Sequence, residues 1–496
     1  MTVQTSFNPR NGLVVPAPAP DSPEAVDAVG ATAAAVAEPM AAVPPATRAG
    51  WLTAIADAVE ADAEPLAALA DEETALGLPR LTGELAGAAR ALRFYGSVAA
   101  EGSYLQAAID RAAPGRPDVR RVNVPLGPVA VFGASNFPFG FGVLGHDTAS
   151  ALAAGCPVVV KAHPAHPRLS ARLAEIAGEA MAGAGVTTGP FGIVHGFDAG
   201  TRLVSHPAVR AVGFTGSLAG GLALWRLAAS RPEVIPVYAE MGTVNTVVVT
   251  PSAAAERPAE IAAGFVSSFT LGMGQFCTKP GLLLAPAGSG LAEETGRALA
   301  AAAPDGWLLT EAIAGAYHSG LDRLASAGGR VVAQLPAAPA GWAGTPTVLA
   351  VDAAALTSGS PLLEECFGPV ALVAEYGSEA ELASVLAALP GSLAAGVHAA
   401  GEDDPQLAGL VATLSKRCGR VVVNGWPTGV ALGWAQQHGG PWPATSAPWV
   451  SSVGAAALSR WVRPVAFQDV PAGALPAALR DDNPWRVPRR VDGVAE

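Results

Sequence analysis

The sequence predicts an α/β protein whose first large unit is built on a parallel, doubly wound sheet. Five short runs rich in β-branched residues carry this prediction, and Ala/Leu-rich segments of helical length lie between them: PVAVFGAS, PVVVKAH, FGIVHG, AVGFTGS and EVIPVYAEM. Continuously apolar strands that alternate with helices are typical of a parallel sheet covered on both faces. The dinucleotide-binding folds are the leading class of this kind.

The region before these strands, from about residue 22 to 110, is predicted to be helical. Its Ala-rich runs show helical spacing, and one begins at Ser22-Pro23. That pair provides a cap followed by proline at the first helical position. The stretch RAAPGRPDVRR, residues 111–121, is polar and broken by proline. We therefore expect it to separate the helical region from the first sheet.

A second α/β region is predicted after Met241, and it contains the motifs GQFC and EECFGPV. The last 40 or so residues carry SRWVRPVAFQDVP and the polar stretch LRDDNPW. The sequence contains no internal repeat that would indicate a solenoid.

Composition limits the partners and the setting. The 496 residues are 50% hydrophobic and 15% charged, with a formal net charge of −12 and no blocks of one sign. This excludes nucleic acid and anionic membranes as main partners. No signal peptide is visible, and the apolar stretches are too short to span a bilayer. Four irregularly spaced cysteines form neither a disulfide framework nor a zinc motif, so we expect a reducing, cytoplasmic setting.

The stretch GQFCTKP raises the question of whether Cys277 is a nucleophile. Alone, it fits a small buried residue equally well. A nucleophilic cysteine needs a base, donors for the charge it creates, and access. Asn136 follows a predicted strand, Glu240 ends another, VGFTGSLAGG runs from a strand into a helix, and EECFGPV places two carboxylates in a turn. Strand ends and helix N-termini are where α/β enzymes hold ligands.

Each of these features also has a structural explanation. A loop asparagine is usually a turn former, a glutamate after an apolar strand is often solvated, and the glycine-rich turn lacks the G-x-G-x-x-G fingerprint. The remaining cysteines, Cys156, Cys366 and Cys418, are predicted to be core residues. His163 and His166 lie in HPAHP, where two prolines exclude the helical spacing of a zinc pair, so no metal is predicted.

Taken together and in this order, the motifs are far more specific. The sequence resembles the aldehyde dehydrogenase superfamily over nearly its whole length, through SNFP, VVKAHPAHP, GFTGS, AEMGTVN, GQFC and EECFGPV. It is particularly similar to the 2,5-dioxovalerate (α-ketoglutaric semialdehyde) dehydrogenase branch. The further motifs that indicate this branch are NGWPTGV, HGGPWPATS and LRDDNPW. Under this resemblance, Cys277 is the nucleophile.

The resemblance implies an aldehyde-dehydrogenase-like fold with three parts. A Rossmann-type NAD(P)-binding domain would comprise residues 1–111 and 127–240, and an α/β catalytic domain residues 241–454. Residues 112–126 and 455–496 would form a small oligomerisation extension. A homodimer or homotetramer is the expected assembly, because VRRVNVP and SRWVRPVAF have the apolar content that an unpaired sheet edge would need to cover.

The resemblance also assigns the chemistry. Cys277 would add to the aldehyde, and the side-chain amide of Asn136 with the backbone N–H of Cys277 would hold the oxyanion. Hydride transfer would leave a thioester, and Glu240 would act as the general base for the water that cleaves it. The presence of Glu240 argues against a CoA-acylating or phosphorylating dehydrogenase, since those relatives generally lack this base. Retention of Cys277, Asn136 and Glu240 together argues against a silent binding homologue.

The cofactor contacts follow the same motifs. Lys161 would reach the adenosine ribose, Ser217 the pyrophosphate, and Glu365 the nicotinamide ribose, with Phe367 beside it; Gly213 is also assigned to the cofactor. Many NAD-preferring relatives carry a glutamate three residues after this lysine, where the present chain has Pro164. Without that carboxylate a 2′-phosphate is not repelled, so NADP is favoured over NAD. Alternatively, Arg168 or Arg202 would read the phosphate.

The expected reaction is oxidation of 2,5-dioxopentanoate to 2-oxoglutarate, and the alternative is another aliphatic or aromatic aldehyde. Two departures bear on this choice. Lys279 occupies a position that is usually asparagine in the branch, and Trp442 and Trp449 could line the aldehyde entrance or simply pack in a core or interface. A cationic partner for the substrate carboxylate is not evident in the sequence.

Overall fold

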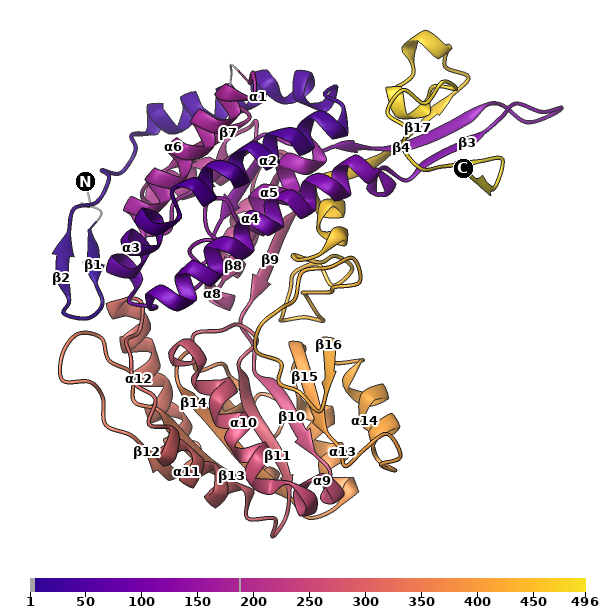
Figure 1. Cartoon of the computed structure of the whole chain (residues 1–496). Coiled ribbons are helices and arrows are strands. Elements are labelled where there is room, and N and C mark those ends of the chain that lie inside the picture. The colour runs from indigo at the N-terminus through magenta and orange to yellow at the C-terminus, as the bar shows by residue number, and fades with distance from the viewer. Residues whose placement is uncertain (1–4, 187–188) are drawn as a thin grey trace.

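The first sheet of the computed structural model, which describes residues 5–186 and 189–496, is five-stranded and entirely parallel (Figure 1). Its strand order is β7-β6-β5-β8-β9. The strands are β5 (Val129–Phe132), β6 (Val158–Lys161), β7 (Phe191–Val194), β8 (Ala211–Gly216) and β9 (Val237–Met241). They lie in the five β-branched runs, so the predicted parallel sheet is confirmed. The strand order reverses between β5 and β8, which is where such sheets bind ligands.

Helices cover both faces of this sheet, as a doubly wound fold requires. Val129, Val131 and Val160 point into a core shared with α2 to α6, whereas Ala130 and Val159 point into a core shared with α1, α7 and α8. The helices are α1 (Pro23–Ala41), α2 (Pro45–Ala61), α3 (Ala63–Thr74), α4 (Leu78–Glu101), α5 (His146–Ala154), α6 (Pro167–Gly183), α7 (Phe197–Ser205) and α8 (Leu218–Ala229). The predicted start of α1 is confirmed, because the Ala25 N–H donates to Ser22 Oγ at 3.3 Å.

The second sheet has the order β12-β13-β14-β11-β10-β15-β16, and its pairs are parallel except for β12 with β13. Helices pack on both of its faces, around two further apolar cores. The strands are β10 (Asn245–Val249), β11 (Pro280–Pro286), β12 (Arg330–Gln334), β13 (Thr347–Asp352), β14 (Val370–Tyr376), β15 (Ser392–His398) and β16 (Cys418–Val423). The helices are α9 (Pro251–Glu256), α10 (Pro258–Thr270), α11 (Leu291–Ala302), α12 (Glu311–Ser326), α13 (Glu379–Ala388) and α14 (Leu407–Leu414).

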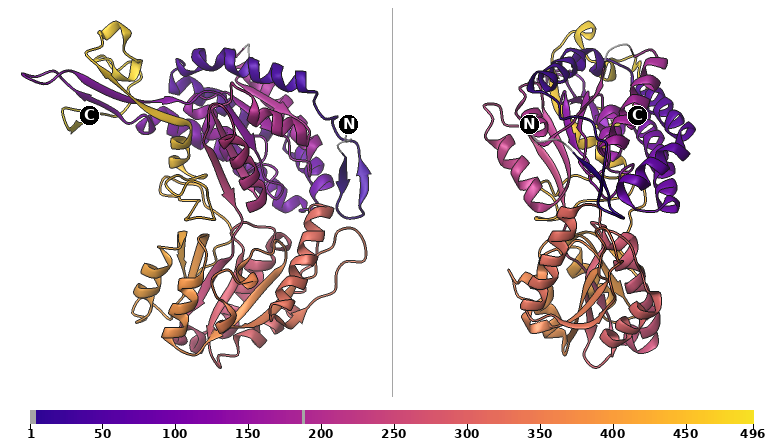
Figure 2. Two further views of the ribbon diagram at one scale, coloured as in Figure 1. Left: turned by 180° about the vertical axis from the view of Figure 1, so that it is seen from behind. Right: turned by 90° about the vertical axis from the view of Figure 1, so that its left-hand side faces the viewer.

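The third sheet forms an arm that extends away from the two larger units (Figures 1 and 2). Its order is β17-β4-β3-β18-β19. Strand β4 (Val119–Pro125) pairs antiparallel with β17 (Val462–Gln468), and the other strands are β3 (Ala107–Asp110), β18 (Arg489–Val491) and β19 (Val494–Ala495). The arm sheet therefore takes β3 from before residue 112 as well as strands from 112–126 and 455–496, whereas Ala455–Trp461 packs into the core of the first unit.

Residues 424–454 lead from β16 back to the first sheet, between the two large units (Figure 1). Thr445 forms an antiparallel bridge with Glu240, and the Met241 N–H donates to the Ala444 carbonyl at 2.9 Å. This returning segment is fixed to the end of β9 by backbone hydrogen bonds. It therefore brings residues distant in sequence to the carboxyl edge of the first sheet.

The remaining elements are short. The hairpin β1 (Ser6–Asn8) and β2 (Leu13–Val15) reaches the second unit, where the Phe7 and Trp342 ring centroids lie 5.5 Å apart. The 3-10 turns are η1 (Ser103–Leu105), η2 (Leu271–Gly274), η3 (Ala353–Ala355), η4 (Pro361–Leu363), η5 (Ala455–Trp461), η6 (Ala472–Ala474) and η7 (Ala477–Leu479). Within the described residues, no helix combines the length and the apolar character needed to cross a membrane.

Candidate active site

Cys277 lies at the mouth of the second unit, between η2 and β11, and it lines a cavity of about 1190 Å³ between the two units. It is half-buried, whereas the other three cysteines are buried. Burial raises the pKa of both Cys156 and Cys418 to about 11. These two thiols are therefore inert core groups, as predicted. Cys366 and Cys277 both line the cavity, but Cys366 is buried and Cys277 is the more accessible of the two.

The loop that carries Cys277 has a defined backbone. Gly272, Met273 and Gly274 all have positive φ, which turns the chain sharply after α10. A Cβ on Gly274 would overlap the Gly368 carbonyl, so glycine is required there. The side chain of Asn245, at the start of β10, donates to the Cys277 carbonyl at 2.8 Å. These contacts fix the direction of the nucleophile before any ligand arrives.

Asn136 lies just beyond the end of β5, as predicted, and it lines the same cavity. Its side chain is buried, and its amide Nδ2 donates to the Gln275 carbonyl at 2.8 Å. An amide nitrogen carries two hydrogens, so this bond orients the group and leaves the second hydrogen available. The amide is thus held next to the Cys277 loop, where an oxyanion would form.

Glu240 lies at the end of β9 and is 4% exposed, so its carboxylate is buried beside the nucleophile. The Ser452 hydroxyl donates to its Oε2, and Oε1 lies 2.8 Å from Nε2 of His438. Burial acts to raise the pKa of Glu240, but the charge of His438 and these hydrogen bonds outweigh it and lower the pKa. The carboxylate is therefore ionised at neutral pH.

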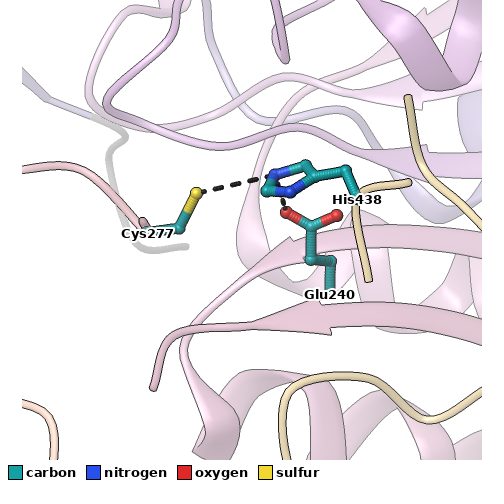
Figure 3. A group of neighbouring side chains, drawn as sticks. All are labelled: Glu240, Cys277 and His438. Carbon is teal, nitrogen blue, oxygen red and sulfur yellow. Dashed lines mark hydrogen bonds and ion pairs between the residues drawn. The ribbon is translucent and has the colours of Figure 1, made fainter. Parts of the chain in front are cut away.

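His438 was not predicted, and it lies between the two reactive side chains (Figure 3). Its Nε2 is 3.8 Å from Cys277 Sγ as well as 2.8 Å from Glu240 Oε1. The ring is 1% exposed. His438 belongs to HGGPWPATS, in which the tryptophans had been the candidates. The structure leaves Trp442 57% and Trp449 78% exposed, and neither is among the described residues that line the cavity.

The cofactor residues proposed from the sequence lie along the cavity, with one exception. Those that line it are Lys161, Pro164, Ser217, Glu365 and Phe367. Gly213 lies inside β8, where its Cα faces Asp147 and Trp461. Among the described residues that line the cavity Gly213 does not appear, so its cofactor role stays a prediction.

Ser217 and Lys161 offer two ways to hold a phosphate-bearing ligand. Ser217 caps α8 by accepting the Gly220 N–H at 3.2 Å, and both residues line the cavity. The N-terminus of α8 therefore faces the cavity, and such a terminus attracts phosphate. Lys161 ends β6 nearby, and burial lowers the pKa of its ammonium to about 8.

Lys279, which takes the place of an asparagine usual in the branch, forms hydrogen bonds with the segment that follows Glu365. Lys279 is buried, and its Nζ donates to the carbonyls of Cys366, Gly368 and Val370 at 2.8 to 2.9 Å. It therefore ties the segment that holds Glu365 and Phe367 to the loop of the nucleophile. Burial raises the pKa of Glu365 to about 7, although the charge of Lys279 opposes this.

The structure shows why the motif AEMGTVN has a glycine at position 242. A Cβ at this position would overlap the carboxylate of Glu365, so only glycine lets Glu365 approach the end of β9. This close approach places the carboxylate of Glu365 in the same cavity as Glu240.

Hydrogen bonds hold both histidines of HPAHP in the loop that the sequence predicted. Nε2 of His166 lies 3.2 Å from the Ala134 carbonyl, and Nδ1 of His163 accepts the Ala165 N–H at 3.1 Å. Arg168 and Arg202, the alternative phosphate readers, form ion pairs with Glu72 and Asp27.

Comparisons with known proteins show which family the chain resembles. The aldehyde dehydrogenase family matches residues 2–441. α-Ketoglutaric semialdehyde dehydrogenase 2 of Azospirillum brasilense is 46% identical over 92% of this chain and 89% of its own length. The α-ketoglutaric semialdehyde dehydrogenase of Acinetobacter baylyi is 40% identical over 90% of this chain and 87% of its own.

Solved structures share the fold. A mutant of aldehyde dehydrogenase C from Pseudomonas syringae, complexed with NAD⁺ and octanal, superposes with a TM-score of 0.80 at 21% identity. It covers 95% of this chain and 94% of its own. A proline utilization A of Bradyrhizobium japonicum superposes with a TM-score of 0.79 at 23% identity. The match covers 91% of the present chain but just under half, 46%, of that protein.

Proposed function

Because the chain belongs to the aldehyde dehydrogenase family, we propose that it oxidises 2,5-dioxopentanoate to 2-oxoglutarate and prefers NADP as its cofactor. One observation carries the reaction class. A single cavity is lined by Cys277, Asn136 and Glu240 and also by the cofactor-domain residues Lys161 and Ser217. The names of the two relatives that are 46% and 40% identical support the choice of aldehyde.

The first half-reaction uses the groups around Cys277. The thiolate adds to the aldehyde carbon and makes it tetrahedral, so that the carbon can release hydride. The amide of Asn136, held by the Gln275 carbonyl at 2.8 Å, donates to the developing oxyanion. Such a donor typically contributes about 3 to 4 kcal/mol to lowering the barrier. When bound, NAD(P) accepts the hydride.

The second half-reaction uses Glu240. Hydride loss leaves a thioester on Cys277, which water must cleave. Glu240 is ionised, lies beside Cys277 and lines the same cavity, so it would remove the proton of the attacking water. The free acid, rather than an acyl-CoA or acyl phosphate, is then the product.

The chain has residues that fit the cofactor. The N-terminus of α8 with Ser217 would hold the pyrophosphate, and Lys161 would face the adenosine ribose. Glu365, brought close to β9 by Gly242, would accept the hydroxyls of the nicotinamide ribose. Among the described residues of the first unit that line the cavity, Glu240 is the one with a carboxylate, so a 2′-phosphate near Lys161 meets little repulsion.

An aldehyde panel tests the proposed substrate. Purified enzyme is given 2,5-dioxopentanoate, succinic semialdehyde, octanal and phenylacetaldehyde, each with NADP and with NAD, and the absorbance of the reduced cofactor is followed. We expect the largest kcat/KM for 2,5-dioxopentanoate. A higher value for an aldehyde without a carboxylate would contradict the substrate and leave the reaction class intact.

Replacing Pro164 with glutamate should move the cofactor preference toward NAD. Pro164 is exposed and lines the cavity just after Lys161, so a carboxylate there would accept ribose hydroxyls and repel a 2′-phosphate. Close charges near a protein surface interact by up to about 4 kcal/mol before screening, so a shift of about tenfold in the ratio of kcat/KM values is expected. The ratio is measured for both variants with one aldehyde. Equal losses with both cofactors would show that the phosphate is read elsewhere.

We further propose that the chain is a homodimer or homotetramer held by the arm. Strand β17 is an edge of the arm sheet, and Val462, Val465 and Phe467 lie along it, each half-buried. An apolar, unpaired edge favours pairing with another copy of the chain. Light scattering at micromolar concentration should give at least twice the monomer mass. A stable monomer would refute this assembly.

A further inference from the structure

His438 connects the nucleophile and the base through one nitrogen atom. Nε2 lies 2.8 Å from Oε1 of Glu240 and 3.8 Å from Sγ of Cys277 (Figure 3). Sγ of Cys277, one ring nitrogen of His438 and one carboxylate oxygen of Glu240 all lie within 4.8 Å of one another. The imidazole is thus placed to exchange a proton with the thiol while the carboxylate compensates its charge.

We propose that His438 holds the thiol proton of Cys277, so that the resting site contains a thiolate and an imidazolium whose charge is compensated by Glu240. This inference rests on the proposed role of Cys277 as the nucleophile. In this step the S–H bond breaks, its electron pair stays on Sγ, and an N–H bond forms at Nε2. No further reactant is needed.

Burial makes the carboxylate necessary. An isolated imidazolium that is 1% exposed would be strongly disfavoured, because it has lost its water. Burial therefore acts to lower the pKa of His438, but the charge of Glu240 and the hydrogen bonds with Cys277 and Glu240 outweigh it and raise the pKa to about 10. A protonated ring has no free lone pair, so we treat the three groups as a proton network and not as metal ligands.

The other charged groups around His438 leave this assignment intact. From α5, His146 faces the ring, and burial together with the charge of His438 lowers the pKa of His146 to about 3, so it is neutral. From η5, Arg460 is paired with Asp147 of α5 at 2.7 Å, and both are buried. From β9, Glu240 supplies the negative charge that the imidazolium needs.

Alkylation tests the proposal without an aldehyde. Full-length enzyme is treated with iodoacetamide between pH 5 and pH 10, and modification of Cys277 is followed by mass spectrometry. A free thiol is half-ionised near pH 8.5, so a thiolate paired with His438 should give a midpoint at least one unit lower. In His438→Gln the midpoint should rise toward the free value, and the rate at pH 7 should fall about tenfold.

Two controls separate this effect from loss of structure. His146→Gln removes a nearby buried histidine that is neutral, so the midpoint of alkylation should not move. Added imidazole should restore alkylation at pH 7 in His438→Ala, which a purely structural role would not allow. Binding of NADP, measured by fluorescence, shows that each variant is folded.

The outcomes are distinct. A wild-type midpoint near that of a free thiol, or the same low midpoint in folded His438→Gln, would overturn the proposal. Neither result depends on which aldehyde is oxidised. Failure of the proposed function would appear separately, as normal turnover in a variant without Cys277.

Discussion

Cys277→Ala is expected to lose aldehyde oxidation by a factor of about 10⁴ or more, because removal of a nucleophile abolishes the covalent route. Cofactor binding should change little, since the thiol acts on the aldehyde carbon. The loop should also keep its course, because the Asn245 side chain donates to the backbone carbonyl of residue 277, which alanine retains, and the glycines set the turn by their positive φ. Steady-state assays give the loss in turnover, and fluorescence titration with NADP gives the binding.

Cys156→Ala is the matched control for this variant. Its thiol is buried and donates to the Trp461 carbonyl at 3.2 Å, away from the cavity. We expect a small decrease in Tm and nearly normal turnover. Turnover near that of the wild type in Cys277→Ala would instead refute the thioester mechanism.

Glu240→Gln should slow thioester hydrolysis by about 10² to 10³. It should also slow hydride transfer, by only about tenfold, because the variant loses the charge that compensates the imidazolium of His438. An amide has the size of the carboxylate and still accepts the Ser452 hydroxyl, but it cannot take a proton from water. Rapid mixing with aldehyde and NADP should therefore give a burst of reduced cofactor, close to one per active site, followed by slow turnover.

The burst serves as the internal control, because it reports the first half-reaction in the same sample. Loss of the burst itself would assign Glu240 mainly to the activation of Cys277. That result would indicate that the ion pair between Glu240 and His438, at 2.8 Å, is needed to hold the thiol proton.

Much of the fold could be predicted because it depends on local pattern. The five β-branched runs became β5 to β9, and the Ser22-Pro23 pair became the start of α1. The arm was harder to delimit. Its strand β3 starts at Ala107, before the polar link. Pairing with β4, rather than the short apolar pattern of β3 itself, decides where this strand lies.

The site was predictable where a motif contains the reactive residue. Asn136, Glu240 and Cys277 each follow a strand or turn signal, and the structure brings all three to one cavity. His438 gave no such signal. It lies 161 residues from Cys277 in a segment rich in glycine and proline, and only the return of residues 424–454 to the end of β9 places it there.

The role of Lys279 could not be predicted either, because it also depends on partners distant in sequence. From the sequence it was a departure next to the nucleophile with no assigned effect. In the structure its ammonium is buried and bonds three carbonyls of the segment that carries Glu365. A buried lysine is expected only where partners satisfy it, and those partners lie 87 to 91 residues away in sequence.

Trapping the acyl-enzyme tests the central claim most directly. Glu240→Gln is mixed with 2,5-dioxopentanoate and NADP, quenched in acid, and its intact mass and peptides are measured. We predict one added 2-oxoglutaryl group per chain, on the peptide that contains Cys277, and its removal by hydroxylamine. Absence of the adduct while reduced cofactor forms, or an adduct on Cys156, Cys366 or Cys418, would contradict the thioester mechanism at Cys277.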